Sequence, residues 1–507
     1  MESAEEFLST GQKFQLGFLE TEKPHPKTVN LSELANTDVS KAIRALVAVD
    51  CEALHKLKEH VNEILELRDS IQATWKSGGR VFLCGCGATG RLSLMLECLY
   101  REQNPQSEKV ISFMAGGDVA LVHSLEGFED FPEFGERHLR QLGFAEQDLL
   151  LAVTEGGETP YVIGAAEAAA KVSRSSPYFL YCNHDSVLRE HVERSRRVID
   201  NKNIKKINLC VGPMALTGST RMQASTVLQL AIGFALLTDF SAEKINYWIE
   251  NLRQYLIENA EVFLPPFIKC ESSEYQAGRY IFYHVHDYPI SVFTDTTERA
   301  PTFSLTPFSH KGAERLLKMQ PSLCYICLPG TKTSEDAWHN LLRRSPRALN
   351  WHDIDSRTKS SYLHAFDFSL EAIKFRNWLT NNKEHSNFEI LRGKDTLLWR
   401  LQDKEMSILW PQDSFSLFEH TLLKMFLNIH STLIMGILGR YERNLMTWVY
   451  PTNGKLIDRA TRYVQALLKE EGIIIPYQKI VEKLFDVKKT ISGNESIVLA
   501  TFAAFIR

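Results

Sequence analysis

The first half of the chain repeats one arrangement, a short apolar run followed by a polar or glycine-containing loop and then a helix. Residues 81–84 run into Gly-Cys-Gly-Ala-Thr-Gly-Arg, and residues 110–114 and 149–153 lead into similar loops. Two more apolar runs lie at residues 178–182 and 207–211. Strands that alternate with helices pair in parallel, because each connection has to cross back over the sheet. The pattern predicts an α/β domain whose functional loops lie at the carboxyl ends of the strands.

A second and weaker α/β pattern follows in the chain. Strands are predicted at residues 280–285 and 323–328, a helix at 333–344, and a long, largely apolar helix at 413–439. Apolar residues at helical spacing also predict helix over residues 38–75, before the first strand. No low-complexity linker separates the two α/β patterns, so we expect the two halves to pack together.

Composition excludes several functional classes. The 507 residues are 44% hydrophobic and 24% charged, which is an ordinary mixture for a globular protein and argues against extended disorder. The 58 basic and 62 acidic residues give a net charge of −4, so no overall positive field predicts nucleic-acid binding. No apolar stretch approaches the ~18 residues that cross a bilayer, and the acidic N-terminus lacks the features of a signal peptide. Nine cysteines in so long a chain predict no disulfide framework, and together these features predict a reducing cytoplasm.

Two motifs have the spacing of metal ligands, but neither is complete. Cys324 and Cys327 lie within one apolar run, where a pair of core cysteines is the more frequent arrangement. His284 and His286 share one face of a predicted strand, and no third ligand has a spacing that completes a site. We therefore predict no metal ion.

The glycine pattern at residues 85–90 resembles a dinucleotide fingerprint. It lacks the acidic residue that should follow about 20 residues later at the end of a second strand, so no nucleotide cofactor is predicted. Two explanations of the glycines stay open at this point. They form either a tight structural turn or an anion site at the start of a helix, where backbone N–H groups point at the ligand.

Four loops, taken together, indicate a family. They are Gly-Cys-Gly-Ala-Thr-Gly-Arg at 85–91, Ala-Gly-Gly-Asp at 115–118 with His-Ser-Leu-Glu-Gly-Phe-Glu-Asp at 123–130, Thr-Pro-Tyr-Val-Ile-Gly at 159–164, and Thr-Gly-Ser-Thr-Arg-Met at 217–222. In this order they resemble the sugar isomerase (SIS) domain of N-acetylmuramic acid 6-phosphate etherases and of glucokinase regulatory proteins. The lead segment at 21–28 also resembles theirs.

The resemblance implies an α/β fold of two SIS domains in tandem, each a parallel sheet flanked by helices. The etherases carry one such domain per chain, whereas the regulators carry two domains and a helical lid. The predicted domains are a helical lead at 1–75, a first SIS domain at 76–258, a second SIS domain at 259–440 and a helical lid at 441–507. The motifs are specific in the first half and faint in the second.

The resemblance also implies site residues. The segment Asp-Thr-Thr-Glu-Arg-Ala-Pro-Thr-Phe at 295–303 resembles the etherase segment whose glutamate acts in catalysis, which is Glu298 here. Glu126 matches the other family glutamate, and Lys455 matches a lysine that contacts the ligand. In an elimination we expect Glu126 as base and Glu298 as acid, since two carboxyls with separated pKa values suit this division. The loop positions that the resemblance implies for ligand binding are Gly87, Ala88, Thr89, Gly90, Gly156, Gly157, Thr159 and Ser219.

The chain departs from the family at the phosphate loops. Ala88 and Gly156 stand where the family usually has hydroxyl residues, and Glu158 stands where etherases commonly have arginine. A carboxylate ~6 Å from a phosphate opposes binding by ~3 kcal/mol at an effective dielectric constant of about 20. Glu155 and Glu158 are therefore expected to weaken phosphate binding if they face the ligand. Two arginines of the neighbouring loops are expected to offset them, Arg91 and Arg221.

Two functions from different classes follow. One is a sensor that binds a phosphorylated or acidic amino-sugar derivative at a site shared by both SIS domains, with a sugar kinase or another protein as its partner. The other is an etherase-like carbon–oxygen lyase in amino-sugar or cell-wall sugar catabolism. The tandem second domain and the missing hydroxyls favour the sensor. We expect neither a nucleic-acid nor a membrane partner.

Overall fold

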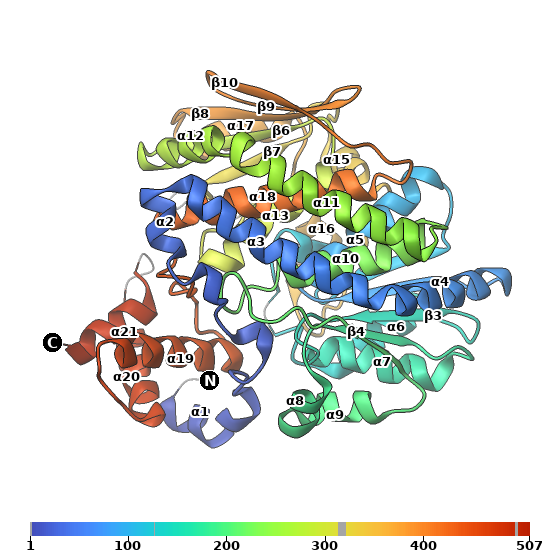
Figure 1. Cartoon of the computed structure of the whole chain (residues 1–507), viewed down its shortest axis with the longest axis horizontal. Coiled ribbons are helices and arrows are strands. Elements are labelled where there is room, and N and C mark those ends of the chain that lie inside the picture. Colours follow the sequence, from blue (N-terminus) through green and yellow to red (C-terminus); the bar gives the residue numbers. More distant parts are fainter. Residues whose placement is uncertain (1–2, 126, 313–320, 492–494, 507) are drawn as a thin grey trace.

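A computed structural model describes residues 3–125, 127–312, 321–491 and 495–506. Two five-stranded sheets lie on opposite sides of a central layer of helices (Figure 1). This arrangement confirms the predicted α/β fold with two sheets in tandem. Among the described residues, no helix is both long enough and apolar enough to cross a membrane.

The first sheet is wholly parallel. Its strands, in spatial order, are β2 (Val110–Met114), β1 (Val81–Gly85), β3 (Leu149–Val153), β4 (Tyr178–Tyr181) and β5 (Lys205–Asn208). Val81 pairs with Val110 on one side and with Leu149 on the other. Every residue of β1, β2 and β3 is buried. Strands β1 and β3 are continuous apolar runs, and β2 is interrupted by Ser112 alone, because helices cover both faces of the sheet.

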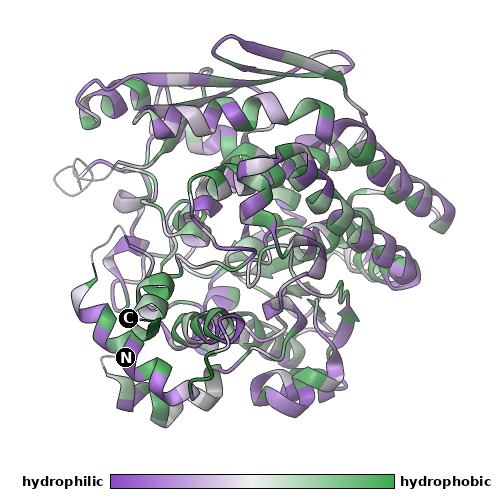
Figure 2. Ribbon diagram, turned by 60° about the vertical axis from the view of Figure 1, so that its left-hand side comes forward, coloured by the Kyte–Doolittle hydropathy of each residue, from purple (hydrophilic) through white to green (hydrophobic). Residues whose placement is uncertain are grey.

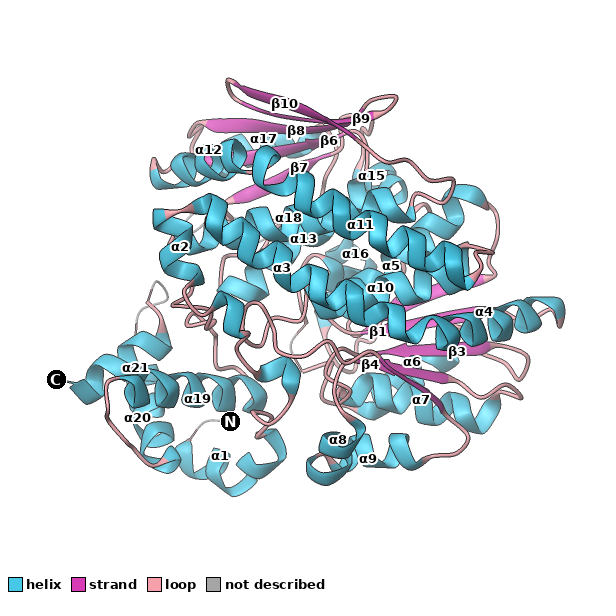
Figure 3. Ribbon diagram, in the orientation of Figure 1, coloured by secondary structure: helices cyan, strands magenta, loops and turns pink. Residues whose placement is uncertain are grey.

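Two pairs of helices cover the first sheet. In Figure 3, α6 (Pro132–Gln141) and α7 (Pro160–Val172) lie below it, and α4 (Val61–Lys76) and α10 (Gln223–Leu237) lie above it. The helices α6 and α7 approach closely because Gly164 has no side chain, since a Cβ atom there would lie 1.9 Å from the Pro132 carbonyl oxygen. The other helices of this half are α5 (Ala88–Gln103), α8 (Asp185–His191) and α9 (Glu193–Asp200).

The second sheet is mixed rather than wholly parallel. Its strands, in spatial order, are β10 (Lys404–Leu409), β9 (Thr396–Leu401), β8 (His385–Arg392), β6 (Tyr280–Val285) and β7 (Cys324–Cys327). Strand β6 pairs in parallel with β7 and β8, as the α/β pattern predicts, whereas β8, β9 and β10 form an antiparallel meander that the sequence analysis does not contain. Figure 2 shows many hydrophilic residues in this outer meander at the top of the molecule.

Two buried helices form the centre of the molecule between the sheets. Every residue of α10 is buried, and so is every residue of α18 (Leu417–Ile437) except Ile437. Such helices are apolar all around because they contact other elements on every side. The other helices of the second half are α11 (Ala242–Phe263), α12 (Pro265–Gln276), α13 (Pro289–Phe303), α15 (Ser334–Leu342), α16 (Ser360–Leu363) and α17 (Glu371–Leu379).

The two ends of the chain meet on one side of the molecule. The C-terminal helices α19 (Gly454–Glu470), α20 (Tyr477–Thr490) and α21 (Ile497–Ile506) lie beside α1 (Ala4–Thr10), as Figure 1 shows at the lower left. The helices α2 (Leu31–Thr37) and α3 (Val39–Leu57) instead contact α18 and α11 of the second half. The helix predicted at 38–75 forms two helices, α3 and α4, which are separated by a 3-10 turn at Lys58–His60.

A buried ion network joins the two halves. Arg344, from the loop after α15, contacts Glu97 of α5 at 3.1 Å and Asp118, which follows β2, at 2.6 Å. Arg347 contacts Glu97 at 3.0 Å. Burial raises the pKa of Glu97, but the charges of Arg344 and Arg347 outweigh it and lower the pKa to about 2. Through these ion pairs, the segment after α15 in the second half contacts α5 and the loop after β2 in the first half.

Candidate functional site

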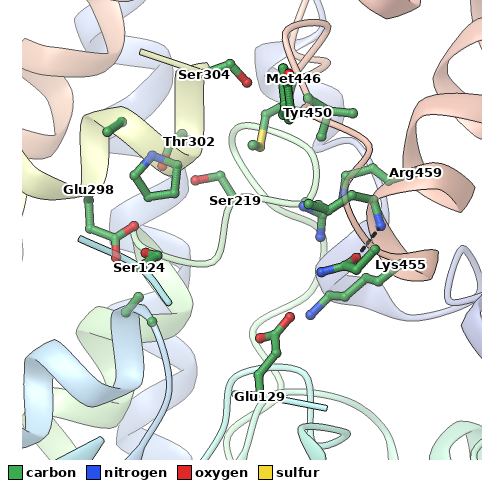
Figure 4. Close-up of a pocket in the computed structure, with 18 of the residues that line it drawn as sticks. Ser124, Glu129, Ser219, Glu298, Thr302, Ser304, Met446, Tyr450, Lys455 and Arg459 are labelled. Atoms are coloured by element: carbon green, nitrogen blue, oxygen red, sulfur yellow. Dashed lines mark hydrogen bonds between the residues drawn. The ribbon is translucent and has the colours of Figure 1, made fainter. Parts of the chain in front are cut away.

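A cavity of about 740 Å³ lies where the two halves and the C-terminal helices meet. Its walls include four loops of the first half, which follow β1, β2 and β3 and precede α10, together with the end of α13 and the segment that leads into α19. In Figure 4, Glu298 and Lys455 approach the cavity from opposite sides, with Ser219 between them and Glu129 below. Seven of the positions predicted from the sequence line it, namely Gly87, Ala88, Gly156, Thr159, Ser219, Glu298 and Lys455.

The loop between β1 and α5 presents backbone rather than a hydroxyl group to the cavity. Gly87 has a positive φ of 53°, which turns the chain into the first turn of α5. The Thr89 hydroxyl accepts from the Cys86 N–H and donates to the Cys86 carbonyl, each at 2.9 Å, so it is used inside the loop. Thr89 and Gly90 do not line the cavity. The start of α5 at Gly87 and Ala88 remains an N-terminus to which an anion is attracted.

The loop between β3 and α7 forms a second wall. Gly156 and Thr159 line the cavity, and the Thr159 hydroxyl bonds to that of Thr154 at 2.9 Å. Gly157 does not line it. With a φ of 73° and space for no side chain beside Leu188, Gly157 instead shapes the turn.

Glu158 is buried at the cavity wall and is neutralised by two cations. Its carboxylate contacts Lys455 Nζ at 2.9 Å and Arg194 at 2.5 Å. Burial raises the pKa of Glu158, but Lys455 and Arg194 outweigh it and lower the pKa to about 2. Glu158 is therefore offset by Lys455 and Arg194, and not by the Arg91 and Arg221 that the sequence indicates. The same contacts tie α19 to the β3–α7 loop.

Glu155 is also buried at the cavity wall, but it has no such partners. Burial raises its pKa to about 8, the charge of Glu298 acts in the same direction, and its own backbone N–H and the charges of Lys455 and Lys424 oppose both. A pKa of about 8 favours the protonated form of this carboxyl at neutral pH. Sequence reasoning treated Glu155 as a fixed negative charge, because burial of one side chain has no local signal.

The two arginines that were expected to offset these glutamates are engaged elsewhere. Arg91 forms an ion pair with Glu298 at 2.5 Å and donates to the Leu121 carbonyl at 3.1 Å. Arg221 contacts Asp295 at 3.0 Å. Arg91 of α5 and Arg221 of the loop before α10 thus connect the first half to α13 of the second half, and Arg91 holds Glu298 at the cavity.

Glu126, the predicted base, lies outside the described residues. Its neighbours Leu125 and Gly127 line the cavity, and so does Ser124. Glu129, which the sequence analysis did not select, lines it as well, and the Cys86 thiol donates to its Oε2 at 3.5 Å.

Glu22 in the lead segment was also not selected, although the match of residues 21–28 to the family was a signal for it. It lines the cavity and forms ion pairs with Arg459 at 2.5 Å and Arg462 at 2.9 Å, both on α19. Burial raises the pKa of Glu22, but these arginines outweigh it and lower the pKa to about 2. Lys455, Arg459 and Arg462 share one face of α19, so Glu158 and the lead segment hold the same face of this helix.

Replacing Glu22 by glutamine is expected to speed hydrogen exchange in α19 about tenfold at neutral pH, since Arg459 and Arg462 lose their carboxylate. Because the pKa of Glu22 is lower than its ordinary value of 4.5, its stabilisation is present above that pH and is lost as the pH falls toward about 2. The difference between the variant and the wild type should shrink over the same range. Glu20→Gln is the matched control, since Glu20 forms an ion pair with the half-exposed Lys23 and not with α19 in the described residues. Equal hydrogen exchange in α19 for the two variants would contradict the expectation.

Comparisons with known proteins agree with the loop motifs. Residues 58–170 match the family model of the glucokinase regulatory protein N-terminal SIS domain. An N-acetylmuramic acid 6-phosphate etherase of Brucella anthropi is 30% identical over 240 residues, which are 47% of this chain and 72% of that protein. An etherase of the same name from Clostridium acetobutylicum is 29% identical over 217 residues, which are 42% of this chain and 66% of that protein.

Among solved structures, tagatose-6-phosphate ketose/aldose isomerase from Escherichia coli aligns with a TM-score of 0.43 at 10% identity, over 85% of this chain and 100% of that chain. The segment matched by the family model contains β1, β2, β3 and the loops that line the cavity after β1 and β3. The match to the Brucella etherase extends over more than two thirds of that protein. The chain therefore belongs to the SIS-domain family that includes the N-acetylmuramic acid 6-phosphate etherases.

Proposed function

We propose that the protein binds a sugar phosphate, or a related acidic amino-sugar derivative, in the cavity shared by its two α/β halves and acts as a sensor. The observation that carries the proposal is the convergence on one cavity of the α5 N-terminus, Glu298 of the second half and Lys455 of α19. A helix N-terminus and a lysine attract a phosphate, whereas a carboxylate accepts hydrogen bonds from sugar hydroxyls. The roles of the individual residues are part of the proposal.

The contacts of Lys455 support a sensor. An anion bound beside Lys455 shares this lysine with Glu158, which lies 2.9 Å away, so ligand binding changes how α19 is held. The helices of residues 441–507 would then act as a lid whose position depends on the ligand. A coupling of this kind between a ligand and a protein partner is typically worth about 1–3 kcal/mol. A sugar kinase or another protein is the proposed partner class.

An etherase-like lyase is the second candidate, and the curated relatives favour it, since those that match are etherases by name. This mechanism would use Glu126 as the base at the sugar C2 proton and Glu298 as the acid at the leaving oxygen. The Arg91–Glu298 ion pair at 2.5 Å stands against that role for Glu298, because the Arg91 guanidinium already occupies one of its carboxyl oxygens. The missing hydroxyls at Ala88 and Gly156 also reduce the binding energy that orients a substrate.

The proposed location is a reducing cytoplasm. All nine cysteines are free thiols, which supports this proposal.

Two assays on the full chain separate the two functions. Sugar phosphates are expected to raise the thermal midpoint, since a ligand that binds only the native state stabilises it. Lactate release from N-acetylmuramic acid 6-phosphate is expected to be absent. Robust release that Glu126→Gln abolishes would replace the sensor by the lyase. If no sugar phosphate changes the midpoint, the binding proposal itself is wrong.

A further inference from the structure

The positive charges at the cavity wall are already matched by acceptors of the protein. Within the described ranges, every arginine and lysine that lines the cavity contacts such an acceptor. The pairs are Arg91 with Glu298, Arg221 with Asp295, Lys455 with Glu158, Arg459 with Glu22, and Lys488 with the Pro451 carbonyl. An anionic group of a ligand therefore has to share these cations with the protein.

Glu155 is different, because its carboxyl lines the same cavity and has no partner in the described residues beyond its own backbone N–H. The residue is 7% exposed, and its Oε1 atom is shielded from water and accepts no hydrogen bond. Within the part of the chain that the structure describes, no lysine or arginine forms an ion pair with it. Lys424 acts on it only through its charge, since its Nζ donates to Arg221 O at 3.0 Å, Thr226 Oγ1 at 2.7 Å and Asn428 Oδ1 at 3.0 Å.

A second carboxyl side chain of this wall, Glu129, has a thiol rather than a cation as its partner. Buried carboxyl groups in proteins are almost always hydrogen-bonded. A buried carboxyl oxygen that has no donor, such as Glu155 Oε1, therefore marks a place for a donor on a ligand. An ammonium group fits best, because it brings three N–H donors and a positive charge of its own, whereas the cations that line the cavity are already paired with acceptors of the protein. A hydroxyl brings one donor and no charge.

We infer that the cavity recognises an amino sugar through its unsubstituted, positively charged amine, and that Glu155 is the residue that selects it. The inference rests on the proposed function, since it takes the ligand to be a sugar derivative. An N-acetylated amine is a poorer partner, because the amide nitrogen has one donor and no charge and the acetyl group adds volume.

Binding of such an amine has a proton balance that can be measured. Before the amine binds, Glu155 carries a proton at neutral pH, since its pKa is about 8. The free amine of the sugar is also protonated near neutral pH. The ion pair forms when the Glu155 carboxyl loses its proton to water while the ammonium keeps its own, so about one proton is released per ligand bound. The charged and titratable groups around Glu155 are Glu298, Lys455 and Lys424 with the thiols of Cys86 and Cys182.

The test is calorimetry on the full chain near neutral pH, in two buffers of different ionisation enthalpy. The probes are glucosamine 6-phosphate, N-acetylglucosamine 6-phosphate and glucose 6-phosphate. We expect the wild type to bind the first about tenfold more tightly than the other two, with proton release for the first alone. Glu155→Gln should lose both the preference and the proton release, and Glu167→Gln, on α7 outside the cavity, should retain both.

The outcomes separate this inference from the proposed function. Equal affinity of the wild type for the three sugars overturns the inference and leaves sugar-phosphate binding in place, and so does a preference that persists in Glu155→Gln. Binding of the amine without proton release also overturns it. If none of the three binds, both the inference and the proposed function are wrong. The wild-type comparison needs no variant, so a folding defect in Glu155→Gln does not remove the test.

Discussion

Replacing Arg299 by methionine is expected to lower the stability of the second α/β half by about 3–5 kcal/mol, because a buried charge network loses its central cation. Arg299 is 2% exposed and contacts Glu271 at 2.7 Å, Asp295 at 3.1 Å and the Tyr283 hydroxyl at 2.8 Å. Without it, two carboxylates stay buried with too few donors. Urea denaturation combined with hydrogen exchange in α13 measures the change.

The deficit of this variant should depend on pH. Burial raises the pKa of both Glu271 and Asp295, but Arg299 and the other donors outweigh it, so both pKa values are lowered. The stabilisation from these carboxylates is present above their ordinary pKa values of 4.5 and 3.8 and is lost as the pH falls below them. The variant lacks that contribution, so the difference in unfolding free energy between the wild type and the variant should become smaller in acid.

A matched control is Arg174→Met, since Arg174 pairs with Glu146 on the surface and its side chain is 75% exposed. Exposed ion pairs contribute little to stability, so this variant should unfold like the wild type. A deficit for Arg299→Met that equals the control, or one that stays constant from neutral to acid pH, would show that the network is not a source of stability.

Replacing Lys455 by methionine is expected to weaken sugar-phosphate binding about 10- to 100-fold, the range of a lost charge-assisted hydrogen bond. Lys455 points into the cavity in Figure 4, and its Nζ atom forms an ion pair with Glu158 Oε1 at 2.9 Å. Its removal takes a cation from the ligand and leaves Glu158 with Arg194 alone, so a carboxylate opposes the phosphate. Calorimetry with glucose 6-phosphate at low and high salt measures the loss, which should be larger at low salt.

Two further variants make this expectation sharper. Lys469→Met changes an exposed lysine at the far end of the same helix, and it should leave the affinity unchanged. The double variant Lys455→Met with Glu158→Gln should recover part of the affinity, because it removes the opposing carboxylate. A loss in Lys455→Met that is no larger than in Lys469→Met would exclude Lys455 from ligand binding.

The parallel strands of the first half could be predicted because helices cover both of their faces, which requires continuous apolar runs such as β1 and β3. Strand β8 was missed for the opposite reason. Its residues alternate between more and less buried positions, so charged side chains such as Glu389 interrupt the apolar pattern. Strand β10, at the edge of the sheet, is exposed along most of its length and carries no apolar run at all.

Within the candidate site, the sequence predicted which loops meet but not how their side chains pair. Glycines and family motifs mark the turns after β1 and β3, because those turns need particular backbone conformations. The partner of Glu158 lies 297 residues away on α19, and no local pattern encodes such a contact. The hydrogen bond from the Thr89 hydroxyl to the Cys86 carbonyl and the raised pKa of Glu155 could not be predicted for the same reason, since both depend on how the chain folds around these residues.

The ion pairs between Glu22 and α19 have a consequence for protein synthesis. The cavity needs Glu22 near the start of the chain and residues as late as Ile497, so almost all of the chain has left the ribosome before its walls can close. The first sheet, whose contacts are shorter in sequence, can fold while the nascent chain is still growing. Stabilisation by a ligand that binds in this cavity is therefore unavailable to the growing chain and begins only once the last helices have joined the fold.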